Sequence, residues 1–531
     1  MKWEKISQIF GLSLVAICFI LALTRVIFRE VESRDPNQIT IRFAHWQLEG
    51  TVPRALDALA AEYMKLHPGI KIEQIRIPNK VFAMWSTTQL VGETAPDLIQ
   101  MQALAADKLV RYMVPLTNYV YEPNPYNKGN EFENIPWRDT FFDGLVNAPS
   151  YNENLLELYG IPQTMHVSRV FYNKDLFKKI MGDTRIPQTY EEFQALCEAV
   201  KAYSKKTDTI VIPLAASRDS TGIGWTLFSS QTQKLTSKTD SINALRGKGL
   251  EENKIAFLKN ELDIASPEYQ SGLRIFREVS QYMQSGYTTL NREDAAFYFL
   301  QGRAVMTMAG SWDASTYFSQ SPFNVGVFTL PLPSPNHPDY GRYVLGPITE
   351  AGLQSSFSFG LSRTSAHPEI ALDFLKFITS KHGNETFSKI AKWLPAVRNV
   401  PLIDIIEGFK PVSDGFPSGP ALSTWGPDVD RLINNNLYLL SDPNGSVEKF
   451  TAAIKPYYNE ALISEARRNL RERLKNSARM DSQIGAASQL SLTDPSDQRK
   501  VSMLFEAQNF NEAGYYYVRY ELKKLGISPD N

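Results

Sequence analysis

Three patterns in residues 39–72 constrain the fold more than any other feature of the chain. Apolar and polar residues alternate over 39–43, which predicts a strand, and apolar residues recur every three or four positions over 52–66, which predicts an amphipathic helix. A second strand follows at 70–72. Two strands joined by a helix predict a parallel sheet with a right-handed crossover, and ligands bind beyond the carboxyl ends of such strands. The loop at 45–49 lies at such an end.

The composition bounds the size of the protein and its partners. The chain has 531 residues, enough for two or more packed cores, and its 43% hydrophobic and 21% charged residues are typical of a globular protein. A formal net charge of −1 argues against a nucleic-acid partner, because such partners usually bind a basic domain. Aromatic residues make up 11%. Aromatic rings pack against the C–H faces of sugars, so this content suits a carbohydrate site, although large cores also use aromatic residues.

The first 30 residues predict a membrane helix. An apolar run of about 20 residues begins at position 9, long enough to cross a hydrocarbon core. No small-x-small cleavage site follows it, and Ile17 occupies the place before Cys18 where a lipoprotein signal has a small residue. We expect an uncleaved single-pass anchor at 1–30, with the folded body outside the cytoplasm. Basic residues flank the run on both sides, so the positive-inside rule favours neither orientation. A cleaved signal is the alternative to the anchor.

The two cysteines exclude a disulfide within the folded body. Cys18 lies in the N-terminal apolar run, which leaves Cys197 alone in the rest of the chain. Cys197 falls on the apolar stripe of a helix that the Thr189 to Glu192 capping box begins. We expect a small buried hydrophobic side chain rather than a reactive thiol.

Enzyme signatures are missing from the sequence. There is no G-x-x-x-x-G-K-[ST] phosphate loop, no G-x-S-x-G nucleophile motif and no H-E-x-x-H pair among the six histidines. These absences predict a protein that is not an enzyme and holds no cofactor or metal. A glycoside-acting enzyme with two unmarked carboxylates stays a remote alternative.

Four segments resemble the signatures of bacterial extracellular solute-binding proteins of the maltose-binding type, the carbohydrate-binding subunits of ABC importers. They are FYNKDLFKK at 171–179, PQTYEEFQALC at 187–197, GRAVMTMAGSW at 302–312 and FGLSRTSAHPEIALDFLKFITS at 359–380. Each is degenerate alone, but the four occur in the family's order. The resemblance implies a two-lobe α/β periplasmic-binding-protein fold, the Venus flytrap, behind the N-terminal helix.

The resemblance also implies how the chain divides between the lobes. Lobe one is expected at 38–164 and 329–392, and lobe two at 165–328 and 393–470, with crossings near 163–166, 325–330 and 393–396. Residues 471–531 run past the expected end and predict a helical C-terminal extension. Its basic stretch at 467–479 is either a solvated helix face or a contact for anionic lipid or a transporter subunit.

Ligand-binding candidates follow from the same resemblance. Trp312 follows Gly-Ser at the end of a buried strand, where the family stacks an aromatic ring on the sugar, and Asp313 either binds a hydroxyl or caps a helix. The others lie on loops or crossings: Trp46 and Glu49 after the first strand, Gln102 after the strand at 97–100, His166 in the first crossing and Trp393 in the last. For His166 the alternative is a structural hinge histidine.

The expected function is capture of a solute without chemistry. A saccharide or similar polar solute would bind between the lobes of a monomer, and hinge closure would present it to ABC permease subunits in the membrane. A membrane-anchored sensor or scaffold with the same fold is the alternative.

Overall fold

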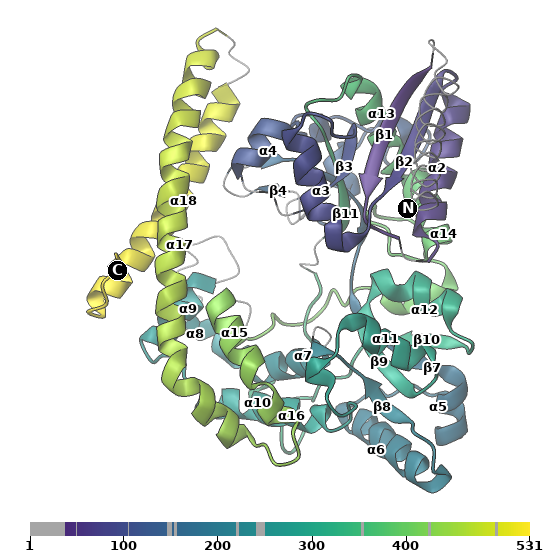
Figure 1. Ribbon diagram of the computed structural model, residues 1–531, viewed down its shortest axis with the longest axis vertical. Helices are drawn as coiled ribbons and strands as arrows, with labels where there is room; N and C mark the ends of the chain where they lie inside the picture. The colour runs from purple at the N-terminus through teal and green to yellow at the C-terminus, as the bar shows by residue number, and fades with distance from the viewer. Residues whose placement is uncertain are drawn as a thin grey trace, which may run out of the picture.

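Two β-sheets form two lobes in the computed structural model (Figure 1). It describes residues 38–48, 50–102, 104, 106–145, 151–152, 155, 157–218, 222–239, 250–351, 355–422, 426–493 and 498–530. The predicted membrane helix at 1–30 lies outside these ranges. Within them, no helix has both the length and the apolar character that crossing a bilayer requires.

Lobe one is built on a five-stranded sheet that includes the two strands predicted at 39–43 and 70–72. Its order is β2 (Ile70–Arg76), β1 (Ile39–His45), β3 (Leu98–Gln100), β11 (Ser355–Leu361) and β6 (Ile161–Met165). β1 runs parallel to β2, as the sequence predicts, and it is also parallel to β3, whereas β11 is antiparallel to its neighbours. One core contains α2 (Val52–Leu66), α13 (Pro368–Ile378) and α14 (Lys381–Ala391); another contains α3 (Asn79–Val91) and α4 (Ala106–Tyr112).

Lobe two is built on a four-stranded sheet. Its order is β10 (Val325–Phe328), β7 (Ser168–Asn173), β9 (Ala304–Gly310) and β8 (Ile212–Ala215). One core joins it to α5 (Lys174–Met181), α6 (Tyr190–Thr207), α7 (Gly222–Gln231) and α10 (Pro267–Ser280). A second core joins the same sheet to α11 (Arg292–Leu300), the 3₁₀ turn η7 (Ser311–Asp313) and α12 (Ala314–Gln320), and this core continues into lobe one. The Thr189 side chain caps α6, since it accepts a hydrogen bond from Glu192 N–H.

Three crossings join the lobes. The first contains only His166 and Val167, between β6 and β7. The second lies later than the predicted 325–330, because β10 pairs with β7 and the hydroxyl of Tyr340 donates to Glu278 of α10 at 2.6 Å. The chain therefore stays with lobe two through 329–350. The third crossing follows Val397. Pro395 and Val397 still belong with lobe one, because they form β-bridges with Thr164 and Phe141.

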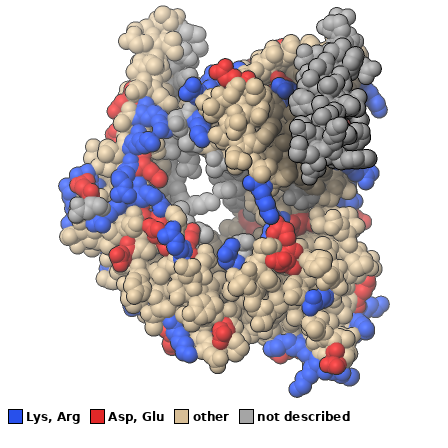
Figure 2. Space-filling view, in the orientation of Figure 1, with Lys and Arg blue, Asp and Glu red and all other residues tan. Residues whose placement is uncertain are grey.

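The C-terminal extension is a helical hairpin of α17 (Val447–Ser491) and α18 (Gln498–Lys524). α17 is one continuous 45-residue helix, so it begins inside the region that the sequence assigned to lobe two. Its first half packs on α9 (Leu250–Leu258), α10, α15 (Pro427–Asn436) and α16 (Tyr438–Ser441). Its second half rises beside lobe one (Figure 1), and the two lobes and the hairpin frame the central opening in Figure 2.

Candidate functional site

Strand ends from both lobes point toward the space between them. In lobe one, β1 and β3 end just before Trp46 and Gln102. In lobe two, β9 ends at Gly310, just before Trp312, while β7 begins just after His166. Since ligands of open α/β sheets bind beyond the carboxyl ends of strands, this edge is the candidate binding site.

Trp312 is the centre of a cluster on lobe two. The Trp312 and His166 rings meet edge to face, with centroids 5.1 Å apart. The Arg292 guanidinium lies over the indole at 5.7 Å and forms an ion pair with Asp313. Gly310 makes room for the indole, because a Cβ there would lie 2.3 Å from the ring. The structure thus brings together three residues predicted separately and adds Arg292.

The cluster keeps unused hydrogen-bonding capacity. Within the described residues, His166 Nδ1 and Trp312 Nε1 are buried and have no hydrogen-bond partner. Burial lowers the pKa of His166, so its imidazole is neutral at neutral pH and has one donor and one acceptor nitrogen. An aromatic face, a neutral imidazole and an Arg–carboxylate pair are groups that suit a polyhydroxylated solute.

The lobe-one side of the site rests on α3. The Trp46 indole packs edge to face on Phe82 at 4.7 Å, and its backbone N–H donates to Gln100 Oε1 at 3.0 Å. Gln102 Nε2 donates to Ser86 Oγ at 2.6 Å. Both predicted residues are therefore held by the helix beside them.

His45 ends β1 just before Trp46 and is fully buried. Its Nδ1 accepts the Gln47 N–H at 3.1 Å, which leaves Nε2 to donate to Gln74 Oε1 at 3.1 Å. Burial is the main cause that lowers the pKa of His45 to about 4. The imidazole is therefore a neutral hydrogen-bonding bridge that holds the start of the loop.

The positions of Trp393, Asp313 and Glu49 differ from what the sequence predicts for a binding residue or cannot be described. Trp393 is 3% exposed and packs against Phe357 and Phe387, a core position that argues against a role in solute binding. Asp313 precedes α12 but makes no side-chain cap bond, so its partner is Arg292 rather than the helix end. Glu49 lies outside the described residues.

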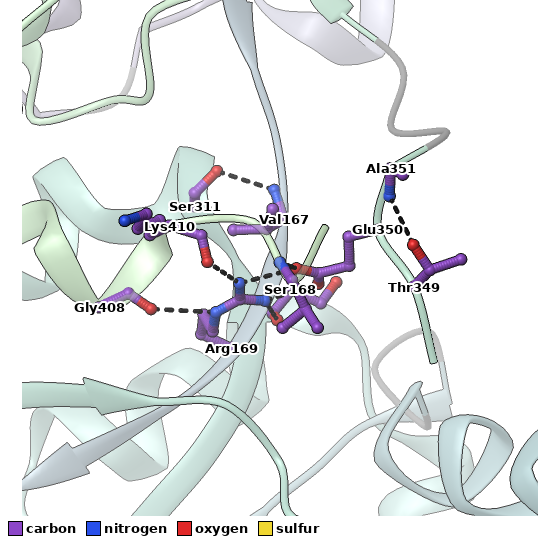
Figure 3. A network of polar contacts seen from close by, with 10 residues as sticks. Val167, Ser168, Arg169, Ser311, Thr349, Glu350, Ala351, Gly408 and Lys410 are labelled. Atoms are coloured by element: carbon purple, nitrogen blue, oxygen red, sulfur yellow. Dashed lines mark hydrogen bonds and ion pairs between the residues drawn. The ribbon is translucent and has the colours of Figure 1, made fainter. Parts of the chain in front are cut away.

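The hinge carries a polar network that sequence patterns did not reveal (Figure 3). Arg169 of β7 is fully buried and uses all five of its N–H donors. It binds the Glu350 carboxylate at 2.7 and 2.8 Å, and the carbonyls of Ser168, Gly408 and Lys410 at 2.7, 3.0 and 2.8 Å. It thus ties together the second crossing, β7, the 3₁₀ turn η9 (Asp404–Phe409) and Lys410 just after it.

Two cavities lie on either side of Glu350. One of about 600 Å³ has Ser168, Met308 and Phe328 in its wall, and one of about 530 Å³ has Met165 and Leu394. Trp312 is not among the residues that line these two cavities. The described residues contain no group of three or more His, Cys, Asp or Glu side chains that could hold a metal ion.

Comparison with known proteins agrees with this architecture. The family model for bacterial extracellular solute-binding proteins matches residues 49–385. The multiple sugar-binding protein of Streptococcus mutans is 24% identical over 408 residues, which cover 75% of this chain and 84% of that protein. Among solved structures, the GacH receptor of Streptomyces glaucescens, studied with acarbose, has a TM-score of 0.55 at 16% identity, over 80% of this chain and 98% of that one. Maltose-bound MalE3 of T. maritima has a TM-score of 0.52 at 17% identity, over 80% and 99%.

Proposed function

Because the chain belongs to the bacterial extracellular solute-binding protein family, we propose that it binds a saccharide between its two lobes and delivers it to an ABC permease. The two-lobe fold and the sugar-binding relative support this proposal. The observation that carries it is the Trp312 cluster, in which an indole face lies beside a neutral imidazole and an Arg–carboxylate pair at a strand-end edge.

Closure about the three crossings is the proposed mechanism. A saccharide that contacts both lobes would favour the closed form, since it makes contacts there that the open form lacks. His166 lies in the first crossing and touches Trp312, so a solute on the indole would act directly at the hinge. The protein would act outside the cytoplasm as a monomer, without catalysis, tethered by the apolar segment within 1–30.

Binding can be tested by calorimetry and thermal shift with the full chain and a panel of mono- and oligosaccharides. A ligand at 100 times its dissociation constant stabilises the protein by about 2.7 kcal/mol, which is visible as a shift in melting temperature. Trp312→Ala should weaken binding by about tenfold or more, and Trp312→Phe by less, because the ring face is retained. Tyr516→Ala removes an exposed aromatic side chain of α18 and is the matched control.

Two outcomes would contradict the proposal. If no saccharide binds, the fold serves another purpose, such as a sensor or scaffold. If a saccharide binds equally well to Trp312→Ala, the site lies elsewhere in the molecule. Delivery is tested separately, by uptake of the identified saccharide in cells with and without this protein.

A further inference from the structure

A direct contact between Gly50 and Ser315 joins the two lobes outside the three crossings. Gly50 lies in the loop between β1 and α2 of lobe one, and Ser315 lies in the first turn of α12 of lobe two. A Cβ atom on Gly50 would lie 2.6 Å from Ser315 Oγ and 2.9 Å from both the Cβ and the carbonyl carbon of Ser315. Side chains in proteins do not approach one another so closely, so only glycine allows these two segments to meet.

Both partners are fixed to their own lobes. The hydroxyl of Thr51, the residue after Gly50, donates to the Ile390 carbonyl of α14 at 2.6 Å. In lobe two, Tyr317 of α12 packs edge to face on Phe171 of β7, with centroids 4.8 Å apart. In Figure 1, α12 lies on the side of lobe two that faces α14. Widening the gap at this contact therefore requires the lobes to move apart.

The contact joins the two segments that carry the predicted site residues. On lobe one it lies at the end of the loop that begins at Trp46, and on lobe two it lies in the helix that follows Trp312. The segment of Trp312 is bound to the first crossing, because Ser311 N–H donates to the Val167 carbonyl at 2.8 Å. The gap at Gly50 is therefore coupled to the hinge and to the spacing of the two site segments.

The contact is tight, but the Ser315 side chain makes no hydrogen bond in it. Ser315 is 1% exposed, and within the described residues its Oγ is buried without a hydrogen-bond partner. A buried hydroxyl without a partner is unfavourable, and water can bind it again when the lobes separate. This balance suits a contact that forms when a bound solute draws the lobes together and opens when the solute leaves.

We propose that Gly50 is a positioning residue that lets the lobes come close enough for Trp46 and Trp312 to contact the same solute. This inference rests on the proposed saccharide function and adds the residue that sets how far the lobes close. Any side chain at position 50 would act as a wedge against Ser315 and hold the lobes apart. It would weaken binding although Gly50 itself is not proposed to touch the solute.

The first measurement is the affinity of the full chain for maltose, raffinose and galactose by calorimetry. Gly50→Ala should weaken the binding of whichever sugar binds by about tenfold, because the binding-competent spacing of the lobes becomes less populated. Gly144→Ala is the matched control and should change the affinity by less than about twofold. Gly144 has a φ of +56°, close to the +46° of Gly50, but a Cβ there would meet nothing within 4 Å. Both variants thus place alanine in a left-handed conformation, and only Gly50→Ala adds the wedge.

Removing the partner side chain should remove the effect. Ser315→Gly deletes the Oγ and Cβ atoms that the wedge would meet, so Gly50→Ala/Ser315→Gly should regain most of the lost affinity. Ser315→Gly alone should bind like the unchanged protein. If the double variant regains nothing, the alanine acts on something other than Ser315 and the inference is wrong.

The second measurement is the distance between the lobes, taken from spin labels on Leu66→Cys and Ile210→Cys in a chain with Cys18→Ser. Leu66 ends α2 of lobe one, and Ile210 lies just before β8 of lobe two. They are 58% and 73% exposed, whereas Cys197 is buried and should stay unlabelled. A sugar that closes the lobes should shorten this distance, and Gly50→Ala should reduce the shortening.

The possible results separate the two proposals. If a sugar binds equally well to Gly50→Ala and Gly144→Ala, the inference about the contact is wrong and the proposed function stands. If both variants lose the same affinity, backbone strain rather than lobe spacing is the cause, and the inference is again wrong. If no sugar binds, the proposed function is wrong, and equal label distances in the two variants would then overturn the inference as well.

Discussion

Replacing Glu350 by Gln should lower the free energy of unfolding far more than a Glu→Gln change in a solvent-exposed ion pair. Glu350 is the only carboxylate that the described contacts place on Arg169, whose side chain is fully buried. Its Oε2 accepts from both Arg169 and Val412 N–H, each at 2.8 Å. In Glu350→Gln one of the two oxygens becomes an NH₂ group, which cannot accept these bonds and removes the counter-charge of the guanidinium.

The magnitude follows from the burial of the pair. Breaking a buried ion pair by removing one partner costs about 3–5 kcal/mol. The Glu350 side chain is 19% exposed, so solvent reaches it and the lower value applies. A unit of about 250 residues unfolds with an entropy of about 0.5 kcal/mol per kelvin, so about 3 kcal/mol corresponds to a fall of about 6 °C in melting temperature.

The assay is thermal unfolding followed by circular dichroism. Glu73→Gln is the matched control, because it removes the same charge from the Lys71–Glu73 pair, whose side chains are 34% and 42% exposed. That change should cost under about 1 kcal/mol. If the melting temperatures of Glu350→Gln and Glu73→Gln differ by less than about 2 °C, Arg169 does not need this carboxylate and the reasoning about the hinge network is wrong.

Three further predictions concern buried groups. Gly310→Ala should displace the Trp312 indole and abolish any saccharide-dependent change in tryptophan fluorescence, whereas Gly485→Ala, where a Cβ meets nothing within 4 Å, should leave it unchanged. Burial lowers the pKa of His45 from its ordinary value of 6.5 to about 4, so its contribution to stability is full above pH 6.5 and falls down to pH 4. Urea unfolding should show a loss of about 2 kcal/mol between pH 8 and pH 5, and His45→Asn should remove this loss. An equal loss in His45→Asn would count against this assignment. Complete burial raises the pKa of Cys197, so its thiol should react with a disulfide reagent only after unfolding, and reaction in the native protein would contradict its burial.

Local patterns in the sequence predicted local structure well. The alternation at 39–43 and the helical period at 52–66 correspond to β1 and α2, because strand and helix each bury one face with its own period. The Gly-Ser-Trp segment at 310–312 lies at the end of β9, as expected. These features depend on residues that are close together in the chain.

Long-range pairs could not be predicted in this way. Arg169 and Glu350 are 181 positions apart, and nothing near either residue marks the other as a partner. Arg292 is the first residue of α11, and Asn291 before it is the N-cap of that helix. This local pattern predicts the start of a helix, but it does not predict that Arg292 contacts Trp312. The resemblance places the second crossing near 325–330, whereas the pairing of β10 with β7, which local patterns do not reveal, keeps this strand in lobe two.

The shortness of the first crossing has a consequence for protein engineering. Side chains alternate between the two faces of a strand, so one residue inserted between His166 and Val167 would either flip β7 or force a bulge. A flipped β7 would turn the Arg169 side chain to the opposite face of the sheet, away from Glu350. The turn at Pro335 and Asn336 is exposed and could take up extra chain. A fluorescent reporter domain therefore belongs at that turn, where it would leave the register between the lobes unchanged.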